Sequence, residues 1–97
     1  MDFRIKENSK RAWIASKFMG FPKIAVVVGR TIYLCKISKI DFIKDKKHLA
    51  HELCHVRQFR QYGFFRFLFL YVLEHLKNGY AQNKFEIEAR AAEEIEV

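Results

Sequence analysis

Residues 48–58 of the chain read HLAHELCHVRQ and contain three of its four histidines and one of its two cysteines. Leu49, Leu53 and Val56 in this stretch are spaced i, i+4 and i+7, which predicts an amphipathic helix with one apolar stripe against a core. The last two of its histidines fall on a different stripe. The stretch therefore predicts a helix that packs through one face and presents histidines on another.

Cap and turn residues divide the rest of the chain into elements. Asp45 is placed to cap the histidine helix and Gly63 to end it. Two β-branched runs on either side of Gly29 predict a β-hairpin. The other expected elements are a helix over residues 9–19, a strand or helix start over 39–43, a helix over 64–77 and a helix from about Asn83 onward. With 97 residues, 51% of them hydrophobic and no internal repeat, residues 1–97 are expected to form one α+β domain with a small antiparallel sheet.

His51 and His55 are four residues apart, so on a helix their rings project from one face and can share a metal ion. Glu52 follows the first histidine and completes the pattern His-Glu-x-x-His. Two neutral imidazoles suit Zn²⁺, which makes a water ligand more acidic, and a nearby carboxylate can take the proton of that water. The pattern predicts a zinc centre with Glu52 as general base. The competing interpretation is a surface helix that carries two histidines.

A catalytic zinc site needs a third protein ligand. The candidates downstream are His75, Glu74, Glu86, Glu88, Glu93, Glu94 and Glu96. Alanines in residues 83–93 would let this segment approach the histidine helix closely. Asn83 and Glu86 also have the spacing of a capping box, in which Glu86 would bond only to the backbone. His48 is an additional candidate ligand, and Cys54 is expected to be a small buried hydrophobic residue rather than a ligand.

The pattern at residues 51–55, HELCH, followed after 30 residues by EIEA at 86–89, resembles the motifs of the gluzincin metallopeptidases. The chain is most similar to the minigluzincins and to the catalytic domains of membrane peptidases that process prenylated proteins. The resemblance implies a minimal zincin-like fold, a peptide or protein substrate, and activity that is latent in some short relatives. Carried to this sequence, it implies the zinc ligands His51, His55 and Glu86, with Glu52 as general base and acid.

Two departures from the family pattern bear on the metal. Glu88 and Ala91 also spell Glu-x-x-Ala, so Glu88 is an alternative to Glu86 as third ligand. Many gluzincins have an aspartate after the alanine that supports a ligand histidine, and Arg90 stands there in this chain. The loss of that support predicts metal affinity weaker by about tenfold or more.

The family usually supplies a side chain that stabilises the oxyanion of the reaction. Tyr80 and His75 are the candidates in this chain, and Tyr71 is a further one. No motif accompanies any of the three, so a structural role is the alternative for each.

Residues 64–73, FFRFLFLYVL, are apolar nearly all round a helix but too few to span a bilayer. One interpretation buries them against the sheet or a partner chain. The other places them at a membrane surface, with Arg60, Arg66 and Lys77 near anionic headgroups, or in a homodimer interface.

The net charge of +7 favours anionic partners. Basic residues gather near the start of the chain, beside two aromatic residues that can stack on bases; they are Arg4, Lys6, Lys10, Arg11, Lys17 and Lys23, beside Trp13 and Phe18. No nucleic-acid motif accompanies them, so specific nucleic-acid binding is not expected. A nucleic-acid-binding domain and an inactive zinc-binding interaction module remain the alternative functions. Two cysteines and no signal sequence predict a cytoplasmic location, with membrane association as an option.

Overall fold

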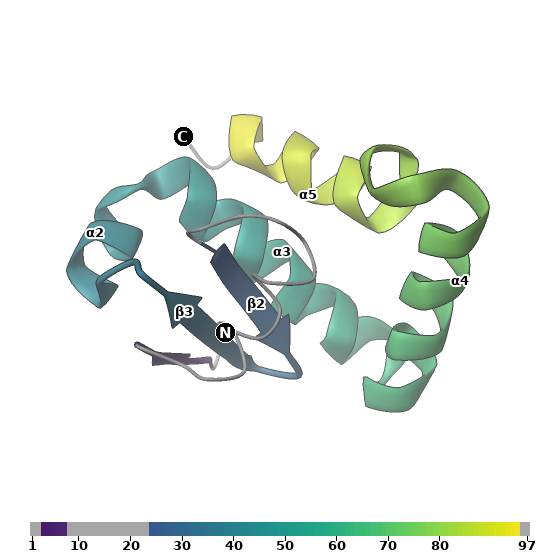
Figure 1. The fold of residues 1–97 in the computed structure, drawn as a ribbon, viewed down its shortest axis with the longest axis horizontal. Helices are drawn as coiled ribbons and strands as arrows, with labels where there is room; N and C mark the ends of the chain where they lie inside the picture. Colours follow the sequence, from purple (N-terminus) through teal and green to yellow (C-terminus); the bar gives the residue numbers. More distant parts are fainter. Residues whose placement is uncertain (1–2, 8–23, 96–97) are drawn as a thin grey trace.

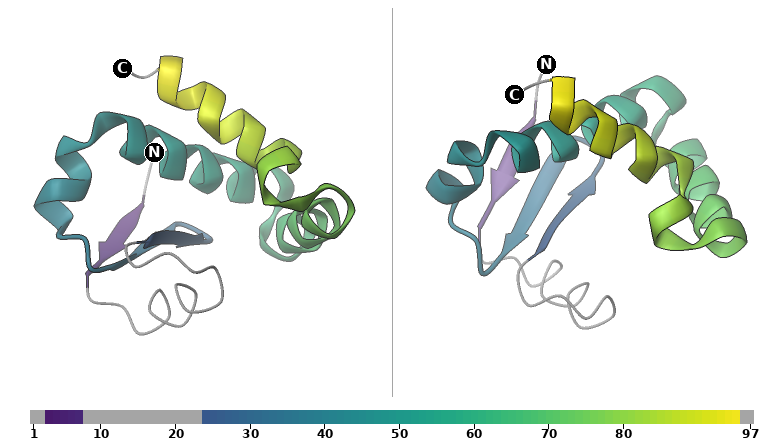
Figure 2. Two further views of the ribbon diagram at one scale, coloured as in Figure 1. Left: turned by 45° about the horizontal axis from the view of Figure 1, so that its top comes forward. Right: turned by 90° about the horizontal axis from the view of Figure 1, so that it is seen from above.

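The computed structural model describes residues 3–7 and 24–95. In chain order the elements are β1 (Arg4–Lys6), β2 (Ile24–Val28), β3 (Thr31–Cys35), α2 (Lys39–Lys44), α3 (Lys46–Tyr62), α4 (Phe64–Gln82) and α5 (Lys84–Ile95). The long helix α3 crosses one face of the sheet, and α4 stands at the end opposite α2 (Figure 1). Helix α5 runs beside α3 (Figure 2). The predicted α+β class is confirmed. The helix expected over residues 9–19 lies outside the described residues.

The sheet has the strand order β1-β3-β2. Strands β2 and β3 form the predicted antiparallel hairpin, and Gly29 in the turn has a φ of 65°. Strand β1 pairs with β3 in parallel, with Ile5 opposite Ile32, so the sheet is mixed and not purely antiparallel as expected. Strand β3 is buried in the middle of the sheet and needs hydrogen-bond partners along both edges, which is why a third strand is present beside the hairpin. The three residues of β1 include one apolar side chain, which is too short a pattern to predict a strand.

Helix α3 has the predicted ends and the predicted apolar stripe. The Asp45 carboxylate accepts a hydrogen bond from the backbone N–H of His48 at 3.1 Å, and Gly63 ends the helix with a φ of 88°. Val56 packs in a buried cluster with Ile32, Leu34 and Phe42, and Leu49 and Leu53 pack against it. The segment 39–43 takes the helical alternative and forms most of α2, which the Ser38 side chain caps.

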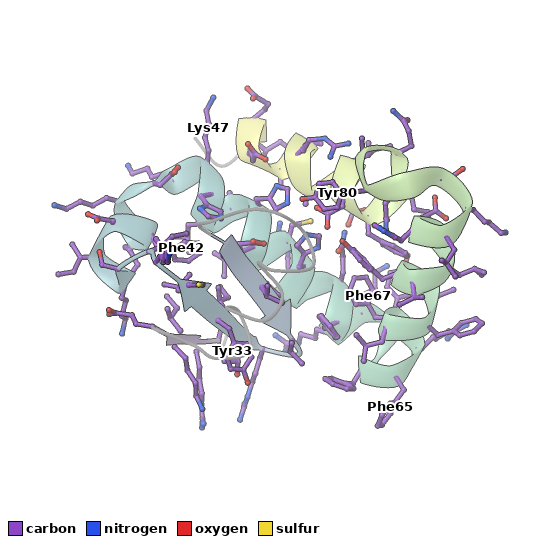
Figure 3. All side chains as sticks on the ribbon, viewed as in Figure 1. Tyr33, Phe42, Lys47, Phe65, Phe67 and Tyr80 are labelled. Atoms are coloured by element: carbon purple, nitrogen blue, oxygen red, sulfur yellow. The ribbon has the colours of Figure 1, made fainter. Side chains whose placement is uncertain are left out.

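Helices α4 and α5 complete the fold. Gly79, with a φ of 77°, interrupts α4 and redirects the chain toward α5. Phe67 points inward from α4 (Figure 3), where it packs with Phe59 of α3 and Phe85 of α5. Phe67 is the single buried residue of α4, so most of the apolar run at 64–73 is not covered by the described residues. No helix in the described part of the chain is long and apolar enough to cross a bilayer.

Candidate metal centre

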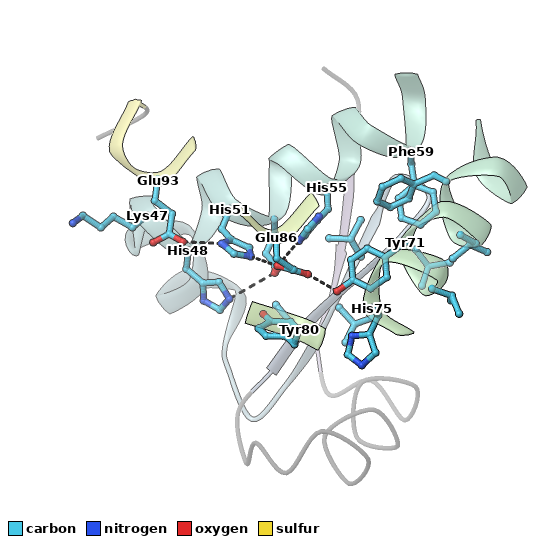
Figure 4. Close-up of a pocket in the computed structure, with 18 of the residues that line it drawn as sticks. Lys47, His48, His51, His55, Phe59, Tyr71, His75, Tyr80, Glu86 and Glu93 are labelled. Carbon is cyan, nitrogen blue, oxygen red and sulfur yellow. Dashed lines mark hydrogen bonds and ion pairs between the residues drawn. The ribbon is translucent and has the colours of Figure 1, made fainter. Parts of the chain in front are cut away.

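Two histidines and a glutamate converge on one point between α3 and α5 (Figure 4). Nε2 of His51 lies 3.0 Å from Oε1 of Glu86, and Nε2 of His55 lies 3.2 Å from the same oxygen. Glu86 is 3% exposed and His55 is 7% exposed. Side chains far apart in sequence thus place three potential ligand atoms within reach of a single ion.

The pairing of α3 with α5 brings these side chains together. Residues late in α3 contact residues early in α5, and the reverse. Gln58 contacts Phe85, Cys54 contacts Glu88, and His51 contacts Glu93. The helices are therefore antiparallel. Ala89 and Ala92 pack against Cys54 in a buried cluster, so small side chains allow the close approach that the sequence predicted.

The same geometry distinguishes between Glu86 and Glu88, the two candidates for the third ligand. Glu88 is exposed, and its carboxylate accepts hydrogen bonds from Nε2 of Gln58 at 2.8 Å and from Sγ of Cys54 at 3.7 Å. The Glu88 carboxylate therefore lies beside Cys54 and Gln58 and not at the point where His51 and His55 converge. The capping-box interpretation of Glu86 is wrong, because the backbone N–H of Asn83 donates to the carbonyl of Tyr80 instead.

Each of the converging side chains has an outer partner that fixes its orientation. Nδ1–H of His51 donates to Oε2 of Glu93 at 2.7 Å, and Nδ1–H of His55 donates to Oε1 of Gln58 at 2.8 Å. The Tyr71 hydroxyl donates to Oε2 of Glu86. Such partners orient metal ligands and make histidine ligands more basic.

The outer partners include one carboxylate and one amide that the sequence did not predict for these roles. The sequence suggested that Arg90 leaves a ligand histidine without a carboxylate, but Glu93, one turn later on α5, provides it. Arg90 instead donates to the backbone carbonyl of Ala81. Gln58 was not among the residues predicted for the site, although its position one turn after His55 on the same helix indicates such a contact.

The side chains around the two histidines favour the protonated, charged form of each ring in the metal-free centre. Both nitrogens of each imidazole lie within hydrogen-bond distance of a side-chain oxygen. Burial disfavours a charged His51, but its hydrogen bonds to Glu86 and Glu93 and the nearby charge of Glu52 prevail and raise its pKa to about 9. The pKa of His55 is also raised despite burial, mainly by its hydrogen bond to Glu86. Burial opposes ionisation of Glu86, yet hydrogen bonds from the two histidines hold its pKa far below its usual range.

Glu52 lies beside the two histidines with a different environment. It is 5% exposed, and its nearest ion-pair partner is His48, whose Nε2 is 3.9 Å from Oε2 of Glu52. Burial raises the pKa of Glu52 to about 7, although the neighbouring histidines favour its charged form. Ligand atoms of His51, Glu52 and His55 all lie within 4.8 Å of one another, so Glu52 is a second candidate for the carboxylate ligand. A carboxyl group with a pKa near 7 can exchange protons near neutral pH.

The centre opens into a cleft of about 860 Å³ between strand β2, α3 and α4. His75 and Tyr80, the two candidates for oxyanion stabilisation, both line this cleft. Burial and the negative charges of Glu86 and Glu52 raise the pKa of Tyr80 to about 12, so its hydroxyl stays protonated and can donate a hydrogen bond. Cys54 is not among the lining residues, and burial raises the pKa of its thiol to about 11. It behaves as the buried residue that the sequence predicted.

Comparisons of the chain with models of protein families, with curated proteins and with solved structures found no match. The chemistry of the centre is therefore argued from its own side chains. Two imidazoles and an ionised carboxylate form a donor set suited to a transition-metal ion, and Glu93 and Gln58 hold the imidazoles so that each Nε2 faces Glu86. These residues could hold a metal ion at the cleft.

The basic N-terminal region is only partly described. Arg4 and Lys6 belong to β1. The other residues of the nucleic-acid hypothesis lie outside the described residues: Lys10, Arg11, Trp13, Lys17, Phe18 and Lys23. That hypothesis gains no support from the geometry of the described part.

Proposed function

We propose that the chain is a zinc-dependent metallopeptidase domain. The observation that supports this proposal is the approach of Nε2 of His51 and of His55 to one oxygen of Glu86, at 3.0 and 3.2 Å. In the proposed site these three side chains hold zinc. A bound zinc ion lowers the pKa of a water ligand toward neutrality and polarises a carbonyl group.

The chain's own residues supply the remaining chemistry. Glu52 is buried beside the ligands and has a pKa of about 7, so near neutral pH its carboxylate can take a proton and later return it to the leaving amine. Tyr80 keeps its hydroxyl proton and faces the same cleft, where it can donate to a developing oxyanion. Apolar side chains, including Val26 and Phe67, form part of the wall of the cleft.

Metal analysis of the purified, untagged protein is the first test. We expect one zinc ion per chain, and loss of that zinc in His51→Ala, because the variant removes one of three ligands. His75→Ala is the matched control, since His75 lies in the same cleft without contacting Glu86, and it should keep its zinc. A protein that takes up no zinc even when zinc is added would contradict the proposal.

Hydrolysis is measured next, on an unstructured protein substrate. We expect cleavage that stops on removal of zinc with 1,10-phenanthroline and returns when zinc is added. Stoichiometric zinc without cleavage of any substrate would instead support the alternative of an inactive zinc-binding interaction module.

The outer carboxylate gives a prediction of its own. Glu93→Gln should weaken zinc binding by about 10- to 100-fold, because His51 loses the charged acceptor that orients it. Competition with a chromophoric chelator measures the change. Glu94→Gln is the control, since Glu94 is the next residue and points to Lys47 at 3.8 Å. Equal affinities of the two variants would show that Glu93 does not support the ligand.

The pKa of His51 predicts how the metal-free protein responds to pH. Its pKa of about 9 in the folded chain exceeds the ordinary value of 6.5 for histidine, so the folded state binds the extra proton more tightly. The stability it contributes is complete below pH 6.5 and is lost as the pH rises through about 9. Zinc must displace this proton, so zinc affinity should rise in the same window by about tenfold per pH unit for each proton displaced.

Thermal unfolding with chelator and with zinc, across this pH range, measures both effects. The difference between wild type and His51→Ala isolates the contribution of His51 from that of other titrating groups. We expect the metal-free difference to shrink as pH rises, while the stabilisation of wild type by zinc grows. A metal-free difference that grows with pH would contradict the assignment of the proton to His51.

A further inference from the structure

Helix α4 exposes apolar side chains to an unusual degree. Phe65 is 83% exposed, Phe69 is 66% exposed and Leu76 is 76% exposed. Phe65 points away from the body of the molecule, on the side opposite to the inward-pointing Phe67 (Figure 3). Contiguous apolar surface of this kind usually marks a site of interaction.

The exposed side chains form one continuous stripe. At 100° per residue, six exposed apolar residues of α4 fall within an arc of about 140° of the helix surface. We call them the outer stripe: Phe65, Leu68, Phe69, Val72, Leu73 and Leu76. No charged residue falls inside this arc. Apolar residues lie on most of the surface of α4, and this arc of them faces outward.

Basic residues border the outer stripe. Arg66 and Lys77 fall about 20° and 40° beyond Leu73 on the helix surface, and both are exposed. The only acidic residue of α4, Glu74, lies on the opposite side of the helix and accepts a hydrogen bond from the side chain of Asn78 at 2.9 Å. The border of the stripe is therefore positively charged.

We propose that the outer stripe of α4 binds the surface of an anionic lipid bilayer. A helix with aromatic and aliphatic residues on one face and basic residues along its edge lies in the membrane interface, where the apolar face enters the acyl boundary. Arg66 and Lys77 then reach the anionic headgroups. The net charge of +7 adds a long-range attraction to the same surface.

A second copy of the chain that packs antiparallel through the outer stripe fits this surface less well. If two outer stripes pack face to face with their helices antiparallel, the basic borders lie on the same side and repel each other. Helix α4 offers no carboxylate near the stripe to neutralise them. A bilayer rich in anionic headgroups satisfies both the apolar arc and its basic border.

The outer stripe is also continuous with the metal cleft. Leu68 and Val72 belong to the stripe and line the cleft as well. A bilayer bound at the stripe therefore lies beside the mouth of the cleft, and the metal centre acts at the membrane surface. Binding itself requires neither metal nor hydrolysis, so it can be tested independently of the proposed enzyme activity.

Sedimentation of the full chain with lipid vesicles tests the proposal. We expect binding to vesicles of phosphatidylcholine and phosphatidylserine, much weaker binding to phosphatidylcholine alone, and loss of binding in high salt. Phe65→Ser/Phe69→Ser should lower the partition coefficient by at least about tenfold. Arg66→Glu/Lys77→Glu should remove the preference for the anionic vesicles.

Helix α2, at the opposite end of the molecule (Figure 1), provides matched controls. Ile40 and Ile43 are 67% and 44% exposed, so Ile40→Ser/Ile43→Ser removes comparable apolar surface, and Lys39→Glu/Lys44→Glu makes the same change of charge. The isoleucine variant should bind vesicles like wild type. The lysine variant lowers the net charge as much as Arg66→Glu/Lys77→Glu does, so it should weaken binding slightly but keep the preference for anionic vesicles. Absence of wild-type binding, or equal losses in the α2 and α4 variants, would overturn the proposal. A wild-type dimer that the phenylalanine variant dissociates, without vesicle binding, would assign the stripe to self-association instead.

Discussion

Glu52→Gln is expected to lower peptide hydrolysis by about 10²- to 10⁴-fold, the usual contribution of a general base, while zinc remains bound. Glutamine has nearly the same shape as glutamate but cannot accept a proton from water near neutral pH. Glu52 is 5% exposed, so the effect does not depend on contacts with bulk solvent. Turnover on an unstructured substrate and zinc content measured on the same sample check the two halves of the result.

The control for this prediction must also remove a negative charge near the cleft. Glu94→Gln does so at an exposed position of α5, and it should keep both zinc and activity. Full turnover in Glu52→Gln would remove Glu52 from the mechanism. Loss of zinc in Glu52→Gln would assign it to the ligands, the role that its position within 4.8 Å of both histidines also permits.

The parts of the fold that could be predicted from sequence are those with local signals. Asp45 and Gly63 mark the ends of α3 through a side-chain cap and a positive φ, and both act within a few residues. Gly29 marks the turn of the hairpin in the same way. The class of the fold follows from these elements and their order along the chain.

Parts that depend on contacts distant in sequence could not be predicted. The three residues of β1 form too short a pattern to predict a strand, and their pairing with β3 joins segments about 27 positions apart in the chain. The outward face of α4 was equally undetermined, because its apolar residues surround most of the helix and any side could have faced the core. Burial of Phe67, with Leu70 and Tyr71 packed against the same cluster, selects the side.

The candidate site also has a part that local sequence predicts and a part that depends on contacts distant in sequence. The spacing of His51 and His55 specifies two ligands within one helix, so the motif alone identified them. The choice between Glu86 and Glu88 depends on how α5 rotates against α3, which side-chain packing decides. Glu93 could be recognised only as one of several acidic candidates, because its contact with His51 spans 42 positions of the chain.

Glu86→Gln is expected to weaken zinc binding by more than about 100-fold, beyond the usual effect of losing an outer partner. The amide keeps the size of the side chain but removes the negative charge that faces Nε2 of both histidines at 3.0 and 3.2 Å. Hydrogen bonds from these histidines hold the pKa of Glu86 far below its usual range, so the carboxylate is ionised and ready to bind a cation at neutral pH. Competition titration with a chelator of known affinity measures the loss.

Glu88→Gln tests whether the Glu-x-x-Ala pattern that binds zinc begins at Glu88 and not at Glu86. Glu88 contacts Gln58, which in turn holds His55, so its substitution should cost no more than the modest effect of a distant support. If Glu88→Gln releases zinc and Glu86→Gln does not, α5 is rotated relative to α3 in the zinc-bound protein. If Glu52→Gln alone releases zinc, the carboxylate ligand comes from α3 itself. The three variants make the same substitution at different positions. A comparison of their zinc affinities therefore identifies the carboxylate ligand without a measurement of activity.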